Sequence, residues 1–142
     1  MVFTDVRPTL IRACPELLKP FEQSDADDHA DLPYLQMGAI ARYLGERLRR
    51  RETGCFASLF EAVEGCIIRG DEVTRNLVIV GLLEDLQNSG VTGVTDLSRW
   101  RPYLGPTTTR AWDALERLWN GDANAWQALS EDLPPAVDET DL

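Results

Sequence analysis

The segment spanning residues 71–88 constrains the fold most, because its centre is apolar almost all round. Residues 77–83 are six apolar side chains and one glycine in succession. Periodicity alone does not separate a buried strand from a buried helix in such a run. The flanks decide, since acidic and amide side chains on both sides extend a helical pattern to about 17 residues. We therefore predict a central helix that other helices must cover, too short in its apolar part to cross a membrane.

The rest of the chain shows helical spacing and no clear strand. We expect two short helical pieces on either side of Pro15, then helices over residues 32–51, 56–70, 107–121 and 122–133. A link rich in glycine and threonine follows the central helix at residues 89–95. The pattern predicts an all-α, single-domain bundle of about five to six helices over residues 1–133, with a spacing like that of a helical repeat. Residues 134–142 are expected to form a disordered acidic tail.

The net negative charge of the chain indicates which kinds of molecule it can bind. The chain has 24 acidic and 14 basic residues, a formal net charge of −10, and the excess gathers in residues 22–31 and 131–142. Such a field repels nucleic acid and anionic lipid and speeds encounter with a basic protein. We therefore predict neither direct nucleic-acid binding nor membrane binding, and a basic protein as the partner.

The cysteines and the N-terminus indicate a compartment. Cys14, Cys55 and Cys66 are odd in number and contain no close pair, which favours reduced, buried thiols over a disulfide framework. With no C-x-x-C motif and a single histidine, His29, a zinc site is not expected. The first residues lack the basic start and long apolar stretch of a secretory signal. These features predict a cytoplasmic protein.

Paired carboxylates are the main candidate chemistry. Glu61 and Glu64 lie three residues apart on one predicted helix, and Glu84 and Asp85 lie on the next. Antiparallel neighbours could bring them together as a metal site or an acid–base pair. Ferritin-like metal sites also use histidine, which the predicted helices lack, so we expect no enzyme activity, metal or cofactor. In a structural role, Glu64 and Glu84 would need a partner, for which the candidates are Arg69, Arg75 and Asn76.

Aromatic residues offer a second set of candidates. Trp112, Trp119 and Trp126 recur every seven residues, a spacing typical of core packing. Trp100 and Tyr103 lie in a predicted linker, where we expect them to be partly exposed. Exposed aromatic side chains beside charged groups often anchor protein partners.

Several short motifs carry a family resemblance. They are Cys14-Pro15-Glu16-Leu17, Leu32-Pro33-Tyr34, Phe60-Glu61-x-x-Glu64, Asn76-Leu77 and Gly81-Leu82-Leu83-Glu84-Asp85-Leu86. Over residues 10–120 the chain resembles a group of small bacterial proteins similar in character to immunity proteins of polymorphic toxin systems. Those proteins are encoded beside toxins delivered by contact-dependent or type VI secretion. The resemblance implies a non-enzymatic inhibitor of a cognate toxin.

We take exposed carboxylates and aromatic residues as candidates for the contact surface. They are Asp25, Asp27, Asp28, Asp31, Tyr34, Glu61, Glu64, Glu84, Asp85, Trp100 and Tyr103. Two other functions stay open at this point. One is an enzyme or metal-binding protein built on Glu61, Glu64 and Glu84, and the other is an adaptor that binds a basic cellular protein.

Overall fold

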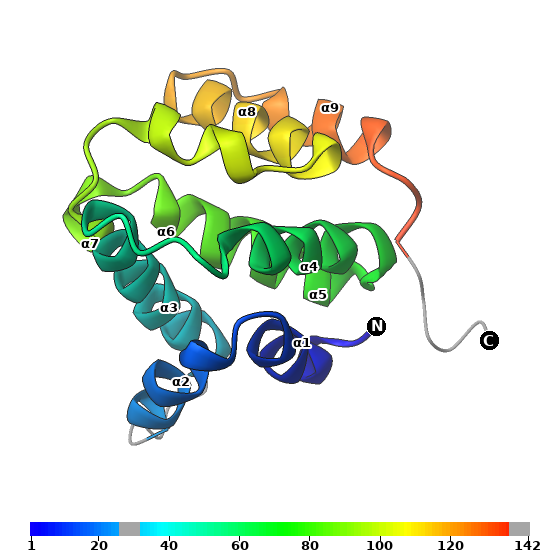
Figure 1. The fold of residues 1–142 in the computed structure, drawn as a ribbon. Coiled ribbons are helices and arrows are strands. Elements are labelled where there is room, and N and C mark those ends of the chain that lie inside the picture. The colour runs from blue at the N-terminus through cyan, green and yellow to red at the C-terminus, as the bar shows by residue number, and fades with distance from the viewer. Residues whose placement is uncertain (26–31, 137–142) are drawn as a thin grey trace.

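The computed structural model describes residues 1–25 and 32–136, and within these ranges the chain is all-α with no strand. Figure 1 shows three tiers of helices, with α8 and α9 on one side, α4, α5 and α6 in the middle, and α1, α2 and α3 on the other. No helix in the described ranges is long and apolar enough to span a bilayer. The predicted all-α class is confirmed. The predicted acidic tail falls mostly outside the described residues.

The N-terminal region forms two short helices. They are α1 (Val6–Ala13) and α2 (Leu18–Ser24), separated by a 3-10 turn at Pro15–Leu17. Pro15 opens that turn, where its fixed φ and missing N–H are tolerated. The prediction of two pieces divided at Pro15 is confirmed.

Helices α3 (Leu32–Arg49) and α4 (Phe56–Arg69) follow the N-terminal region, and both are amphipathic. The apolar stripe expected on α3 is buried as predicted, at Met37, Ile40, Ala41, Leu44 and Leu48. The helix ends before the predicted stop at Gly54, because Arg51 takes a left-handed conformation with φ 59°. The polar face of α3 stays exposed, so the helix forms an edge of the fold.

The central helix is present and carries an unpredicted π-helical turn. It runs through α5 (Glu72–Asn76), the π-helical Leu77–Leu83 and α6 (Glu84–Leu86) without leaving helical backbone angles. Asp71 caps it as predicted, with its side chain accepting a hydrogen bond from the backbone N–H of Thr74 at 2.8 Å. Val80 alone in the π-helical turn is exposed, at 38%. The predicted central helix is therefore confirmed.

A glycine lets α3 approach the central helix closely. A Cβ on Gly81 would lie 3.1 Å from Cγ of Met37 and 3.4 Å from Cδ1 of Tyr34. The first distance is tighter than ordinary van der Waals contact, so Gly81 permits a close approach that alanine would disturb. This contact fixes the side of the central helix on which Tyr34 lies.

The C-terminal third begins with a helix where a loop was predicted. Residues Ser89–Thr92 form α7, because the Asn88 side chain accepts a hydrogen bond from the N–H of Gly90 and Gly93 ends the turn with φ 72°. Two 3-10 turns follow at Leu97–Arg99 and Arg101–Tyr103. Helices α8 (Pro106–Trp119) and α9 (Ala125–Asp132) then pack against each other.

A disulfide joins Cys14 and Cys55, so the prediction that these thiols are reduced is wrong. Cys14 follows α1 and Cys55 precedes α4, and their Cα atoms lie 5.4 Å apart. The two residues are 41 positions apart in the sequence, and only the packing of α1 on α4 brings them together. Cys66 is a free, buried cysteine, as predicted, and burial raises the pKa of its thiol to about 11.

The disulfide predicts a specific thiol count and a stability loss. Denatured, unreduced protein should react as having one free thiol, that of Cys66. Replacement Cys55→Ser should lower the free energy of unfolding by about 4 kcal/mol, because opening a loop of this length frees the unfolded chain. Chemical denaturation with and without reductant measures this. The variant should be insensitive to reductant, and three reactive thiols in the oxidised wild type would contradict the bond.

Candidate partner-binding face

Two neighbouring carboxylates lie near the C-terminal end of the central helix, just before its last core residue. Leu86 is fully buried, while Glu84 and Asp85 just before it are only partly buried. Successive residues of a helix point about 100° apart, so the two neighbouring carboxylates face different helices. Each carboxylate lines a separate hollow of the surface.

We call the first hollow the Tyr34 groove. It has a volume of about 610 Å³ and is lined chiefly by Tyr34, Leu35, Gly38, Arg42, Asp85 and Val91. A Cβ on Gly38 would lie 3.3 Å from Oδ2 of Asp85, so the glycine leaves room for the carboxylate against α3. The groove therefore combines an apolar wall with two carboxylates, those of Asp85 and Glu46, and the guanidinium of Arg42.

Asp85 sits in an environment that disfavours its charge. Burial raises the pKa of Asp85, the neighbouring carboxylate of Glu84 raises it further, and Arg42 opposes both effects. The ionised form is therefore less stable in the folded chain than in water. A cation that approached this carboxylate would relieve that penalty.

The second hollow, which we call the Trp119 hollow, lies between α6 and α8. It has a volume of about 500 Å³, and its lining includes Glu84, Gln87, Glu116 and Trp119. Trp119 is 66% exposed, the largest value among the exposed large apolar residues of the described chain. Glu116 accepts hydrogen bonds from the indole N–H of Trp112 at 2.9 Å and from Arg101 at 3.1 Å. Glu84 has neither of these restraints.

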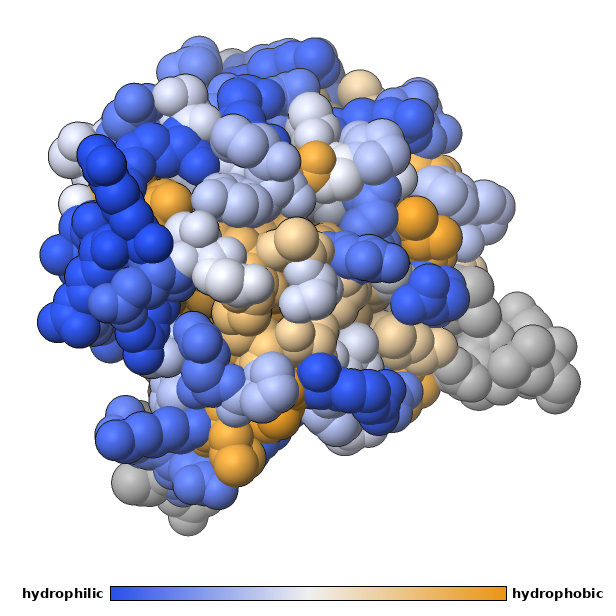
Figure 2. Space-filling model, viewed as in Figure 1, coloured by the Kyte–Doolittle hydropathy of each residue, from blue (hydrophilic) through white to orange (hydrophobic). Residues whose placement is uncertain are grey.

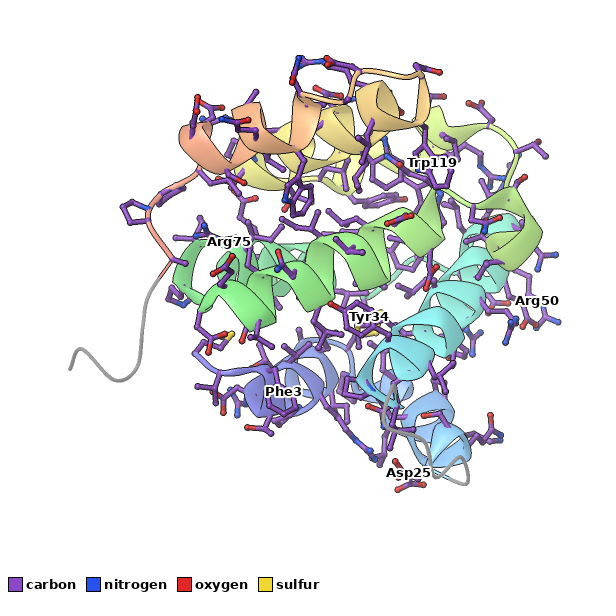
Figure 3. The ribbon with its side chains drawn as sticks, turned by 180° about the vertical axis from the view of Figure 1, so that it is seen from behind. Phe3, Asp25, Tyr34, Arg50, Arg75 and Trp119 are labelled. Atoms are coloured by element: carbon purple, nitrogen blue, oxygen red, sulfur yellow. A yellow bond between two sulfur atoms is a disulfide. The ribbon has the colours of Figure 1, made fainter. Side chains whose placement is uncertain are left out.

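The two hollows share one side of the molecule, which Figure 3 views directly. Tyr34 and Trp119 lie on opposite flanks of the central helix in that view. We define the anionic face as six residues, namely Tyr34, Leu35, Val80, Glu84, Asp85 and Trp119. The opposite side, in Figure 2, has apolar residues near its centre and hydrophilic residues around its edges. Exposed apolar residues thus occur on both sides of the molecule. The candidate site is defined by exposed apolar residues that lie next to two partly buried carboxylates.

The structure unites three of the predicted site residues and separates others. Tyr34, Glu84 and Asp85 all lie on the anionic face. Asp25 instead forms an ion pair with Arg7 at 2.6 Å, and this hydrogen bond lowers the pKa of Asp25. The predicted residues Asp27, Asp28 and Asp31 lie outside the described residues.

Glu64 has a structural role, with partners other than those predicted. Its carboxylate accepts hydrogen bonds from the backbone N–H of Thr107 at 3.0 Å and of Thr108 at 2.6 Å. The hydroxyl of Thr108 donates a third at 2.7 Å. The expected partners Arg69, Arg75 and Asn76 were therefore wrong for Glu64. The carboxylate binds the positive N-terminus of α8, joining α4 to α8.

The carboxylates proposed as a metal or acid–base cluster do not converge. Glu61 is exposed on α4, Glu64 is bound to α8, and Glu84 lines the Trp119 hollow. Within the described ranges, the acidic and cysteine groups close enough to share a metal ion are Cys14, Glu16 and Cys55, and both sulfurs are in the disulfide. The arrangement of the glutamates gives no support to carboxylate-based chemistry.

The prediction that Trp100 is exposed is wrong. Its side chain is 0% exposed and stacks on Phe56 with ring centroids 6.1 Å apart. Tyr103 is partly buried and packs edge-on against the same ring at 5.1 Å. The 3-10 turns fold back on α4, so these aromatic residues attach the linker to the core.

Trp119 is a site residue that the sequence analysis missed. Its spacing from Trp112 predicted a core position, and Trp112 is indeed buried. Trp119 is the last residue of α8, just before Asn120 and Gly121, where no further turn covers it. The nearness of the helix end was the available signal, and it should have outweighed the seven-residue spacing.

With this geometry in hand, comparison with known proteins places the chain in a family. Residues 7–120 match the model of the domain of unknown function DUF7674, and the chain belongs to that family. The matched range includes α3, the central helix and α8, and hence every residue of the anionic face. The chain has no significant match among curated proteins or solved structures.

The Glu64 interaction yields a pH-dependent prediction. Burial alone raises the pKa of Glu64, but the hydrogen bonds from Thr107 and Thr108 outweigh it, so the folded pKa lies below the usual value of 4.5. Glu64→Gln should lower the free energy of unfolding by about 1–2 kcal/mol at neutral pH. The difference from wild type should shrink as the pH falls through the folded pKa, because the ionised form provides the stabilisation.

Denaturation curves from neutral to acid pH test this prediction. Glu61→Gln is the matched control, since it removes an exposed carboxylate from the same helix and should change stability little. An equal effect of the two substitutions, or a Glu64→Gln effect that is independent of pH, would contradict the assignment.

The carboxylate of Asp85 should lower the stability of the fold at neutral pH, the opposite of the effect predicted for Glu64. Because its folded pKa is raised, the ionised group destabilises the folded chain above that pKa, and the penalty is absent below the unfolded value. Asp85→Asn should therefore increase stability at neutral pH and have little effect in acid. Thermal unfolding at both pH values measures this, and lower stability of the variant at neutral pH would refute it.

Proposed function

We propose that this protein is a non-enzymatic inhibitor that binds a basic partner protein, of the immunity type found beside bacterial toxins. The anionic face is the observation that carries the proposal. It places two partly buried carboxylates among exposed aromatic and aliphatic side chains on one side of the fold. This composition suits a protein interface in which aromatic anchors are combined with charge pairing.

The net charge supports a cationic partner. A chain of net charge −10 attracts a basic protein over long distances and accelerates their association. Toxins that act on nucleic acid present basic surfaces to their substrate, and an anionic inhibitor competes for such a surface. The family resemblance in the motifs around Tyr34 and Glu84 points to the same class.

Asp85 gives the face a means of favouring a cation over a neutral group. Its ionised form is disfavoured in the free protein, chiefly by burial and then by Glu84. A guanidinium or ammonium group in the Tyr34 groove would lower the pKa of Asp85 and recover that cost on binding. A neutral partner group would leave the carboxylate uncompensated in a drier site.

The compartment is part of the proposal. We propose the cytoplasm of the producing cell, as the resemblance implies, but the Cys14–Cys55 disulfide weighs against it. Disulfides persist in oxidising compartments and are rare in the cytosol. Thiol trapping of the protein in intact cells would decide between the two locations.

Binding to the product of the neighbouring gene tests the function. The pair should form a complex whose Kd rises by about tenfold or more between low and high salt. Co-expression should rescue growth from the toxic partner. The double variant Glu84→Gln, Asp85→Asn should weaken binding and rescue, whereas the matched control Glu61→Gln should not. Absence of binding and rescue would remove the proposal, and binding to a non-toxic basic protein instead would identify an adaptor.

A further inference from the structure

The Trp119 hollow has the chemistry of a receptor for one cationic side chain. Three kinds of group meet there, namely an exposed indole, a carboxylate and a side-chain amide. The indole ring offers a negative face to a cation. The hollow is formed where the end of α8 passes α6, and Trp119 lies toward the central helix in Figure 3.

The hollow holds two carboxylates, which differ in whether they already have hydrogen-bond partners. Glu116 is held by the Trp112 indole and by Arg101. Glu84, in contrast, is only partly buried and forms no ion pair or side-chain hydrogen bond within residues 1–25 and 32–136. It therefore adds a carboxylate whose lone pairs face the hollow and its solvent.

Gln87, one of the residues that line the hollow, also carries an unsatisfied acceptor beneath the surface. The Gln87 amide N–H₂ donates to the backbone carbonyl of Trp112 at 3.0 Å, which fixes the orientation of the amide. Its Oε1 atom is buried and has no hydrogen-bond partner among the described residues. A buried acceptor of this kind is uncommon in folded proteins and calls for a donor.

We infer that the Trp119 hollow binds an arginine side chain of the partner protein. The planar guanidinium would lie against the indole of Trp119 and donate to the carboxylate of Glu84. The hollow, at about 500 Å³, has room for this group together with water. The inference rests on the proposed function for the origin of the arginine, while its chemistry is specific to this hollow.

Arginine fits these groups better than lysine does. A guanidinium presents five donors in a flat fork and is weakly hydrated, so it can stack on an indole while it donates sideways. An ammonium is a compact and strongly hydrated charge that cannot stack. The arrangement of an exposed ring and a carboxylate around one space matches the flat group.

Short peptides test the hollow without any toxin. Acetyl-Gly-Arg-Gly-amide would be titrated into ¹⁵N-labelled protein, alongside versions with lysine or with citrulline, the neutral isostere of arginine. We expect the arginine peptide to shift the indole N–H signal of Trp119 and the amide signals of Glu84 and Gln87. Binding of the lysine peptide should be weaker, and the citrulline peptide should cause no saturable shift.

Variants locate the binding. Trp119→Ala and Glu84→Gln should each weaken binding of the arginine peptide by about fivefold. The matched controls are Leu118→Ala, which removes an exposed apolar side chain next to Trp119, and Glu61→Gln on α4, and both should leave binding unchanged. Thermal unfolding would show that the variants remain folded.

The results separate this inference from the proposed function. Equal binding of arginine and citrulline peptides, shifts that map elsewhere, or no binding at all would overturn the arginine site. Lysine binding as tight as arginine binding would overturn the guanidinium assignment. Each of these outcomes leaves the partner-binding test standing, because that test does not use the peptides. Loss of partner binding with intact arginine selectivity would overturn the function alone.

Discussion

Burial of the apolar run Leu77–Leu83 is the constraint on which the rest of the fold depends. Six of its seven residues are buried, so helices must cover it from several sides. Helix α3 makes the most extensive contact with it, and α4 and α8 also touch it. Burying each large aliphatic side chain contributes roughly 1.5–3 kcal/mol, so the run makes a substantial contribution to tertiary stability. Glu64 then joins two of the covering helices through the N-terminus of α8.

The same burial creates the anionic face. Glu84 and Asp85 lie near the end of the central helix, between α3 and α8, and each of these helices contributes an exposed aromatic side chain beside them. The π-helical turn ends immediately before Glu84, and π-helical turns occur frequently at functional sites. It adds one residue to the turn and thereby changes which side chains point to α3 and to α8. The position of the two carboxylates is thus a consequence of how the apolar run is packed.

The sequence predicts elements well where a local pattern is strong. The helix flanks of residues 77–83, the stripe on α3 and the break at Pro15 all act within a few residues, and all three predictions are confirmed. Contacts set by tertiary packing were not predictable in the same way. Cys14 meets Cys55 only because α1 packs on α4, and Glu64 meets α8 only across 43 positions. Trp100 is buried because the linker folds back on the core, and Trp119 is exposed because α8 ends there. Neither feature produces a periodic pattern in the sequence.

Cross-saturation NMR on the complex with the basic partner tests the central claim most directly. Saturation of the partner should reach the methyl groups of Leu35 and Val80, which are exposed on the anionic face. The exposed Ile68 on α4 serves as a control within the same spectrum and should receive little saturation. Transfer to Ile68 in preference to Leu35 and Val80 would show that the partner docks elsewhere, and the account of the anionic face would be contradicted.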